Sequence, residues 1–208
     1  MNTRNKPTKL LGLLSLAGGL AAIPLMIAFA LTGWGAPGTA AYRTYELLNR
    51  LMAIALLLMA GGWLGLVLRL ATIDRRSGQA LKSPGGYGRW GAWLALLGAV
   101  GMVLGNAAEF WLFSNLSYDC CNVRHTAWGT FLLGLLVTAI GATVSGAALL
   151  RTQDGPRWSG VILALALPLF LLGFGVAPFL GPAVLALGLG WLLVTSPGPF
   201  HRHNAPAS

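Results

Sequence analysis

The stretch GMVLGNAAEFW, residues Gly101–Trp111, lies at the end of a long apolar segment and carries two polar side chains, Asn106 and Glu109. Glu109 is the one carboxylate placed well inside an apolar segment of this chain. A charge within a bilayer is costly, so it faces the interior of a helix bundle and either has a partner or performs a function. The segments around this stretch therefore decide both the fold and the place of a site.

The composition predicts a membrane protein. Of the 208 residues, 56% are hydrophobic and 9% are charged, whereas soluble domains carry about 25% charged residues. The formal net charge of +9 does not indicate nucleic-acid binding, because Lys and Arg lie between the apolar segments and form no single patch. We expect these cations to set the topology and to contact anionic lipids, above all in the basic loop 69–89.

The apolar segments predict an all-α, polytopic transmembrane bundle, because a helix of about 20 apolar residues spans the hydrocarbon core. We expect about six helices at 10–32, 46–69, 91–113, 127–150, 158–176 and 179–194, which together form a transmembrane domain over 10–194. Residues 1–9 are expected as an N-terminal segment, and the Pro-rich residues 195–208 as a flexible tail. The first helix is expected to remain uncleaved, since it is longer than the roughly 7–15-residue core of a signal peptide.

The last two predicted helices have an alternative. Pro168 and the Gly- and Pro-containing residues 173–182 interrupt this apolar region. A re-entrant hairpin also fits, provided that its irregular backbone is buried in protein.

The distribution of cations predicts the orientation. One set of loops and termini holds eleven Lys or Arg residues, and the opposite set holds three. Because cytoplasmic loops are enriched in Lys and Arg, we expect both termini in the cytoplasm and a multi-pass protein of a bacterial inner membrane. The first set is Arg4, Lys6, Lys9, Arg69, Arg75, Arg76, Lys82, Arg89, Arg151, Arg157 and Arg202, and the second is Arg43, Arg50 and Arg124. Aromatic residues near the helix ends are expected as interfacial anchors: Trp34, Tyr42, Tyr45, Trp90, Trp111, Tyr118, Trp128 and Trp158.

Small residues predict the inward faces of the third and fourth helices. With about 100° of rotation per residue, Gly98, Gly101, Gly105 and Glu109 share one side of the third helix, so Glu109 is expected to point into the bundle. A stripe on the fourth helix recurs at spacings of three and four: Thr130, Gly134, Thr138, Gly141, Ser145 and Ala148. We predict that both stripes are helix-packing surfaces, and a hydroxyl-lined solute path is the alternative for the second.

A polar cluster is predicted on the outer side, where the start of the second helix meets the end of the third. We expect Glu109 to pair with Arg50, or with Arg124 or His125 from the loop above. The interpretation we favour is an ion-pair and hydrogen-bond network that locks the second and third helices together. The alternative is a proton, cation or polar-ligand site, with a carboxyl group that titrates near neutrality. The cluster comprises Glu46, Asn49, Arg50, Asn106 and Glu109.

Two adjacent cysteines, Cys120 and Cys121, lie in a loop expected on the outer, oxidising side. A bridge between neighbours closes a small strained ring, so we expect ordinary thiols or a bridge to another chain, with thiol redox chemistry as an alternative. His125 and Asp119 lie nearby, but the set lacks metal-ligand spacing such as Cys-x-x-Cys. We therefore predict no metal site.

Several enzyme classes are excluded by what the apolar segments lack. They contain no histidine, which excludes a haem held between two helix histidines and disfavours a serine nucleophile with a histidine base. The chain has neither a His-Glu-x-x-His motif nor a phosphate-binding glycine loop. We therefore expect a non-enzymatic membrane protein without a cofactor, which acts by interaction with another membrane protein or a second copy. A small proton-coupled transporter or polar-ligand carrier centred on Glu109 is the alternative.

Overall fold

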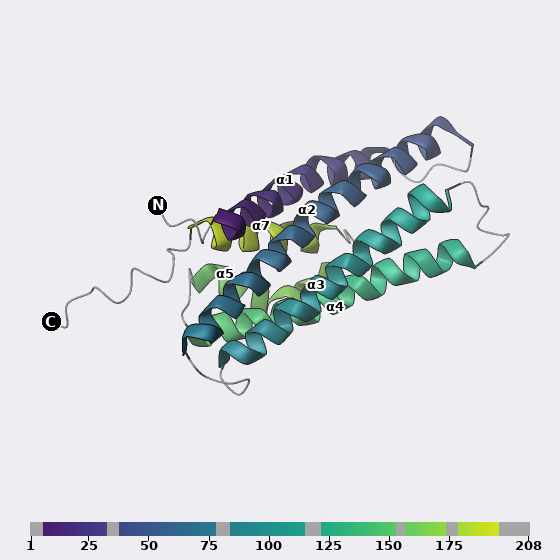
Figure 1. The fold of residues 1–208 in the computed structure, drawn as a ribbon. Helices are drawn as coiled ribbons and strands as arrows, with labels where there is room; N and C mark the ends of the chain where they lie inside the picture. Colours follow the sequence, from purple (N-terminus) through teal and green to yellow (C-terminus); the bar gives the residue numbers. More distant parts are fainter. Residues whose placement is uncertain are drawn as a thin grey trace.

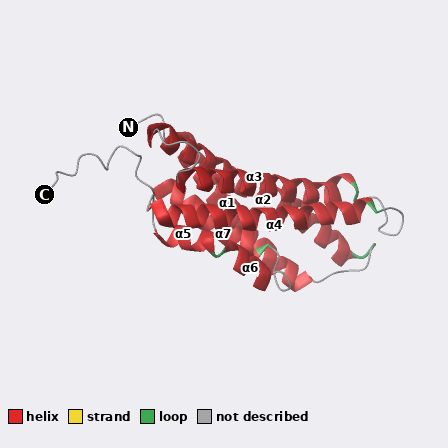
Figure 2. Ribbon diagram, turned by 90° about the horizontal axis from the view of Figure 1, so that it is seen from below, coloured by secondary structure: helices red, strands yellow, loops and turns green. Residues whose placement is uncertain are grey.

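The computed structural model describes residues 6–32, 38–77, 84–114, 122–152, 157–173 and 179–195, and it is an all-α bundle (Figure 1). No strand occurs among these residues (Figure 2). The helices are α1 (Lys6–Thr32), α2 (Ala40–Ser77), α3 (Pro84–Ala107), the π-helical turn η2 (Ala108–Leu112), α4 (Val123–Thr152), α5 (Arg157–Ala164), α6 (Ala166–Gly173) and α7 (Leu180–Thr195). The predicted all-α helical bundle is confirmed.

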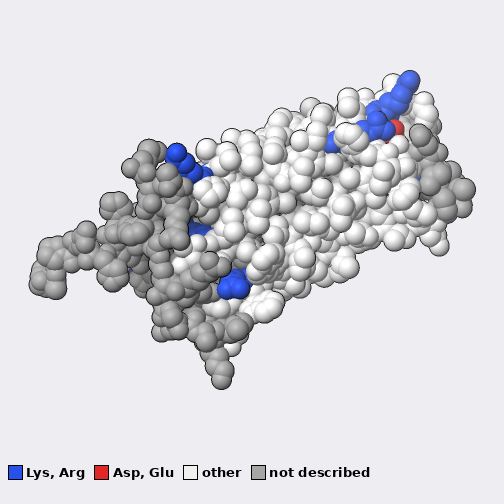
Figure 3. Space-filling model, viewed as in Figure 1, with Lys and Arg blue, Asp and Glu red and all other residues white. Residues whose placement is uncertain are grey.

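Four helical segments are long and apolar enough to cross a membrane: Lys6–Thr32, Ala40–Thr72, Gly86–Leu112 and Val123–Arg151. We call the end of the bundle where α1 begins the inner end, and the end where α2 begins the outer end. On the face seen in Figure 3, the charged residues lie near these two ends and a broad zone between them is uncharged. This distribution matches an apolar bilayer core with polar boundaries.

The long helices form two antiparallel hairpins, α1–α2 and α3–α4, which meet along α2 and α3 (Figure 1). The shorter helices fill the inner part of the bundle. α7 lies against α1 and α2, and α5 lies against α4 and α7. The last described helix, α7, therefore packs against the first, α1.

Glycine contacts hold α3 and α4 together at backbone distance. A Cβ atom built on Gly98 would lie 2.6 Å from the Gly134 carbonyl oxygen, and one built on Gly134 would lie 2.6 Å from the Gly98 carbonyl oxygen. Small residues permit such close approach in membranes, where packing replaces the hydrophobic effect as the driving force. The predicted packing role of both stripes is confirmed. Thr130, expected in the stripe, is instead exposed and donates to Thr126 O at 2.8 Å.

Hydroxyl groups strengthen the same contact. Thr138 Oγ1 donates within its own helix to Gly134 O at 2.8 Å and lies 3.4 Å from Ala95 O of α3. Ser145 Oγ donates across to Gly88 O of α3 at 3.1 Å. Hydroxyl groups of the stripe therefore form hydrogen bonds both within α4 and between α4 and α3.

The predicted fifth helix, 158–176, is divided in two at Leu165. Pro168 has no N–H for the helical ladder, and the Leu167 N–H donates to Thr143 Oγ1 of α4 at 3.1 Å. Regular bonds continue on either side, from Leu165 N to Val161 O at 3.0 Å and from Leu169 N to Leu165 O at 2.9 Å. A threonine on a neighbouring helix thus satisfies the backbone where the proline interrupts it.

Other expected bounds shift by a few residues. α2 begins at Ala40 and ends at Ser77, beyond the predicted 46–69, and α1 begins at Lys6 within the predicted N-terminal segment. Residues 157–173 measure about 25 Å and α7 about 24 Å at 1.5 Å per residue. Both lengths are below the roughly 30 Å of a hydrocarbon core. Two short spans and a re-entrant hairpin therefore both stay as predictions, and the connecting residues 174–178 lie outside the described ones.

Candidate functional site

Buried polar side chains converge at the outer end of the bundle. Asn49 of α2 is 2% exposed, Asn106 of α3 1%, Glu109 of η2 3% and Arg124 of α4 2%. With the half-buried Arg50 and Glu46 of α2 they form what we call the outer polar cluster: Glu46, Asn49, Arg50, Asn106, Glu109 and Arg124. The prediction that Glu109 points inward is confirmed by its burial.

Glu109 lies in a π-helical turn, where the sequence predicts a regular α-helix to residue 113. The Phe113 N–H donates to the Ala108 carbonyl at 2.9 Å, five residues back. A π turn holds one more residue per hydrogen-bonded ring than an α turn, and such turns often occur at functional sites. Glu109 and Phe110 are both buried within this turn.

Arg50 binds the backbone beside Glu109. Its Nε donates to the Phe110 carbonyl oxygen at 2.8 Å. The last carbonyls of a helix lack partners within the helix, and a cation at this end also interacts favourably with the helix dipole. Arg50 therefore ties the outer part of α2 to the end of the third span, and its predicted ion pair with Glu109 stays a prediction.

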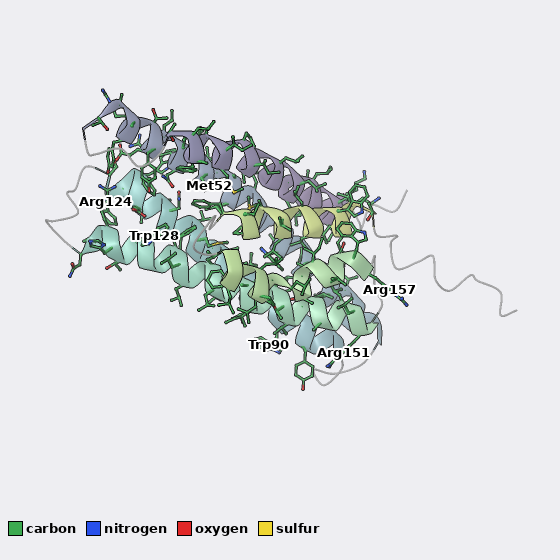
Figure 4. All side chains as sticks on the ribbon, turned by 180° about the vertical axis from the view of Figure 1, so that it is seen from behind. Met52, Trp90, Arg124, Trp128, Arg151 and Arg157 are labelled. Atoms are coloured by element: carbon green, nitrogen blue, oxygen red, sulfur yellow. The ribbon has the colours of Figure 1, made fainter. Side chains whose placement is uncertain are left out.

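Arg124 belongs to the cluster although the sequence suggests a loop position. α4 begins at Val123, which places Arg124 in its first turn (Figure 4). Its Nη2 lies 3.1 Å from the Tyr42 hydroxyl oxygen, to which it donates. The neighbouring His125 is exposed. Burial thus distinguishes two adjacent basic residues that the sequence alone treats as equivalent candidates.

Tyr45 connects the three helices of the cluster. Its carbonyl accepts a hydrogen bond from Asn49 Nδ2 at 3.0 Å, and its phenol lies within electrostatic range of Glu109 and Arg124. Its ring packs against Phe110 with a centroid separation of 5.6 Å. Tyr45 therefore combines a polar contact with a packing contact, and it is not simply the interfacial anchor that the sequence suggests.

An aromatic layer borders the cluster, and sequence reasoning did not find it. Its rings come from α1, α2, η2, α4 and the turn residue before α7, and they are linked in series by centroid separations of 5.2–5.9 Å. The residues, in order of contact, are Phe110, Tyr45, Phe29, Phe179, Phe131 and Trp128. Offset and edge-on ring pairs stabilise beyond their buried area. The available signal was that four of these aromatic residues, Phe29, Tyr45, Phe110 and Trp128, lie within two turns of the outer ends of the long helices.

Asn106 has an unusual environment. Its Oδ1 is buried and has no hydrogen-bond partner among the residues that the structure describes. Buried polar atoms almost always have a partner, either in the protein or in an ordered water molecule. The Asn106 amide oxygen is therefore a buried acceptor that the hydrogen bonds of the described residues leave unsatisfied.

The remaining candidates from the sequence are the cysteine pair and a metal site. Cys120 and Cys121 lie outside the described residues, as does Asp119, so the predictions about them are unchanged. Within the described ranges, no group of three or more His, Cys, Asp or Glu residues could hold a metal ion.

The chain matches no protein-family model, and it has no significant match among curated proteins or solved structures. Geometry and chemistry are therefore the basis for a functional assignment.

Proposed function

We propose that this chain is a multi-pass protein of a bacterial cytoplasmic membrane that acts without catalysis, as a rigid interaction or accessory protein. Both termini lie in the cytoplasm, as the eleven-to-three distribution of cations favours. The basic residues of 69–89 then face anionic lipid headgroups. The partner is another membrane protein or a second copy of the chain.

One observation carries this proposal. Several polar side chains that bond between helices donate to backbone carbonyls of neighbouring helices. Ser15 Oγ of α1 donates to Ala186 O of α7 at 2.9 Å, and Arg69 Nη1 of α2 lies 3.3 Å from Leu192 O of α7. Arg50 and Ser145 make the same kind of bond to Phe110 and Gly88. Groups used in this way hold helices together, which is the chemistry of a fixed scaffold.

The test is photocrosslinking in living cells. A photoreactive phenylalanine analogue is placed at Leu20 of α1, Leu133 of α4 or Leu171 of α6, which are 59%, 62% and 67% exposed. An interaction protein is expected to give a discrete protein adduct from one of these faces, while the other two faces label lipid. Lipid adducts alone at all three positions would contradict the proposal.

A second function, a small proton-coupled transporter or polar-ligand carrier centred on Glu109, is favoured by a separate observation. Asn106 Oδ1, one turn before Glu109, is the buried acceptor described above. A buried acceptor one turn before a carboxylate that lies in a π turn near one membrane face is suitable for holding a proton donor next to that carboxylate.

Proton flux into vesicles tests this second function. Vesicles that contain the protein and an entrapped pH-sensitive dye are expected to acidify faster than empty vesicles under an imposed potential. Asn106→Leu and Glu109→Gln should each remove most of the excess rate, whereas Glu46→Gln should leave it unchanged. Equal rates for empty and protein-containing vesicles would exclude proton transport.

A further inference from the structure

At the inner end of the bundle, the end of α7 contacts both the inner part of α2 and the start of α5. Arg69 of α2 contacts the carbonyl of Leu192 in the last turn of α7. Next to this carbonyl, Trp191 packs against Trp158 in the first turn of α5, with ring centroids 6.2 Å apart and an interplanar angle of 48°. Both indoles remain accessible, with Trp158 44% and Trp191 48% exposed. They are therefore paired with each other while still facing outward.

The tryptophan pair lies between apolar side chains toward the middle of the bundle and a basic side chain on the other side. Val161 and Leu165 follow Trp158 at spacings of three and seven residues and are 42% and 47% exposed. They form an apolar strip that runs from the tryptophan pair toward the middle of the bundle. At the other side of the pair, Arg157 is exposed at the first position of α5.

The charge of this end is uniformly positive among the side chains that the structure describes. Arg151 and Arg157 both lie there (Figure 4), as do Lys6 and Lys9 at the start of α1. The two carboxylates whose side chains the structure describes, Glu46 and Glu109, belong to the outer end, and the side chain of Asp74 in the last turn of α2 is outside the described ones. An exposed arginine one residue before an exposed indole suits a phosphate group, because the guanidinium binds phosphate through paired hydrogen bonds and indoles prefer the headgroup level of a bilayer.

We infer that Arg157, Trp158 and Trp191 form a binding site for an anionic phospholipid, with the headgroup at Arg157 and an acyl chain along Val161 and Leu165. The inference rests on the proposed membrane location, and it adds a defined lipid to a general attraction of basic loops for an anionic surface. The exposed apolar strip favours a lipid over a free phosphate, since phosphate alone leaves the strip and both rings uncovered.

The experiment measures thermal stability of the purified full chain in detergent as phosphatidylglycerol is added. The melting temperature is expected to rise with phosphatidylglycerol, and neither phosphatidylcholine nor inorganic phosphate should reproduce the shift. Arg157→Gln should weaken the apparent phosphatidylglycerol affinity about fivefold. Trp158→Leu should weaken it in the same direction, and it serves as a second variant if the first does not fold.

Arg43→Gln is the matched control, because Arg43 is an exposed arginine at the outer end. It should leave the phosphatidylglycerol affinity within about twofold of the unmodified chain. An equal stabilisation by phosphatidylcholine or phosphate, or an equal loss in the Arg43 variant, would overturn the lipid site. Extraction of the chain from membranes by alkaline carbonate would instead overturn the membrane location itself, so the two failures are distinguishable.

Discussion

Gly134→Ala is expected to lower the melting temperature in detergent by about 10 °C, which corresponds to about 3 kcal/mol for a chain of this size. The added methyl group would lie 2.6 Å from both the Gly98 carbonyl oxygen and the Met102 nitrogen. Both are backbone atoms of α3 and cannot move aside by a rotamer change. The α3 and α4 backbones must therefore separate, which weakens one of the close contacts between the two helices. Thermal unfolding followed by size-exclusion chromatography measures this effect.

Gly129→Ala is the matched control for this experiment. Gly129 lies on the same helix, and a Cβ built on it meets nothing within 4 Å. Because alanine has a higher helix propensity than glycine, this variant is expected to be as stable as the unmodified chain or slightly more stable. Equal melting temperatures for the two variants would show that the α3–α4 contact is not as close as described.

Glu109→Gln and Arg124→Gln are each expected to lower the free energy of unfolding by about 3 kcal/mol. The two residues carry opposite charges, are 3% and 2% exposed, and both lie within electrostatic range of the Tyr45 phenol. Removal of one charge leaves the other buried with less compensation. The double variant should therefore lose less free energy of unfolding than the sum of the two single losses, by about 1–2 kcal/mol. Unfolding in mixed micelles with increasing SDS gives the three values.

Glu46→Gln is the control for this cycle. Glu46 lies on α2 in the same cluster but is half-buried, and its replacement is expected to change stability by less than about 0.5 kcal/mol. If the double variant loses as much free energy of unfolding as the two single variants together, within about 0.5 kcal/mol, then Glu109 and Arg124 do not compensate each other. The network interpretation of the outer polar cluster would then be wrong.

The candidate site was predictable only in part, and the reason differs between residues. Burial of Glu109 followed from helical periodicity, because Gly98, Gly101 and Gly105 mark the side of the helix that a neighbour approaches. The π turn that carries Glu109 had no local signal, since nothing in the sequence AEFWL opposes an α-helix. Arg50 was correctly associated with the end of the third span, but its recorded bond goes to the Phe110 carbonyl. A backbone acceptor is common to all residues and cannot be identified by sequence pattern.

By itself the sequence determined that the chain is a bundle of long apolar helices, which helix faces carry the small residues, and where the cations concentrate. These properties depend on length, composition and periodicity, which are local quantities. Only the tertiary structure decided that Arg124 is buried while His125 is exposed, that six aromatic rings form one layer, and that Thr143 satisfies the backbone beside Pro168. Each of these depends on contacts between residues far apart in the chain, and such contacts exist only once the helices have packed.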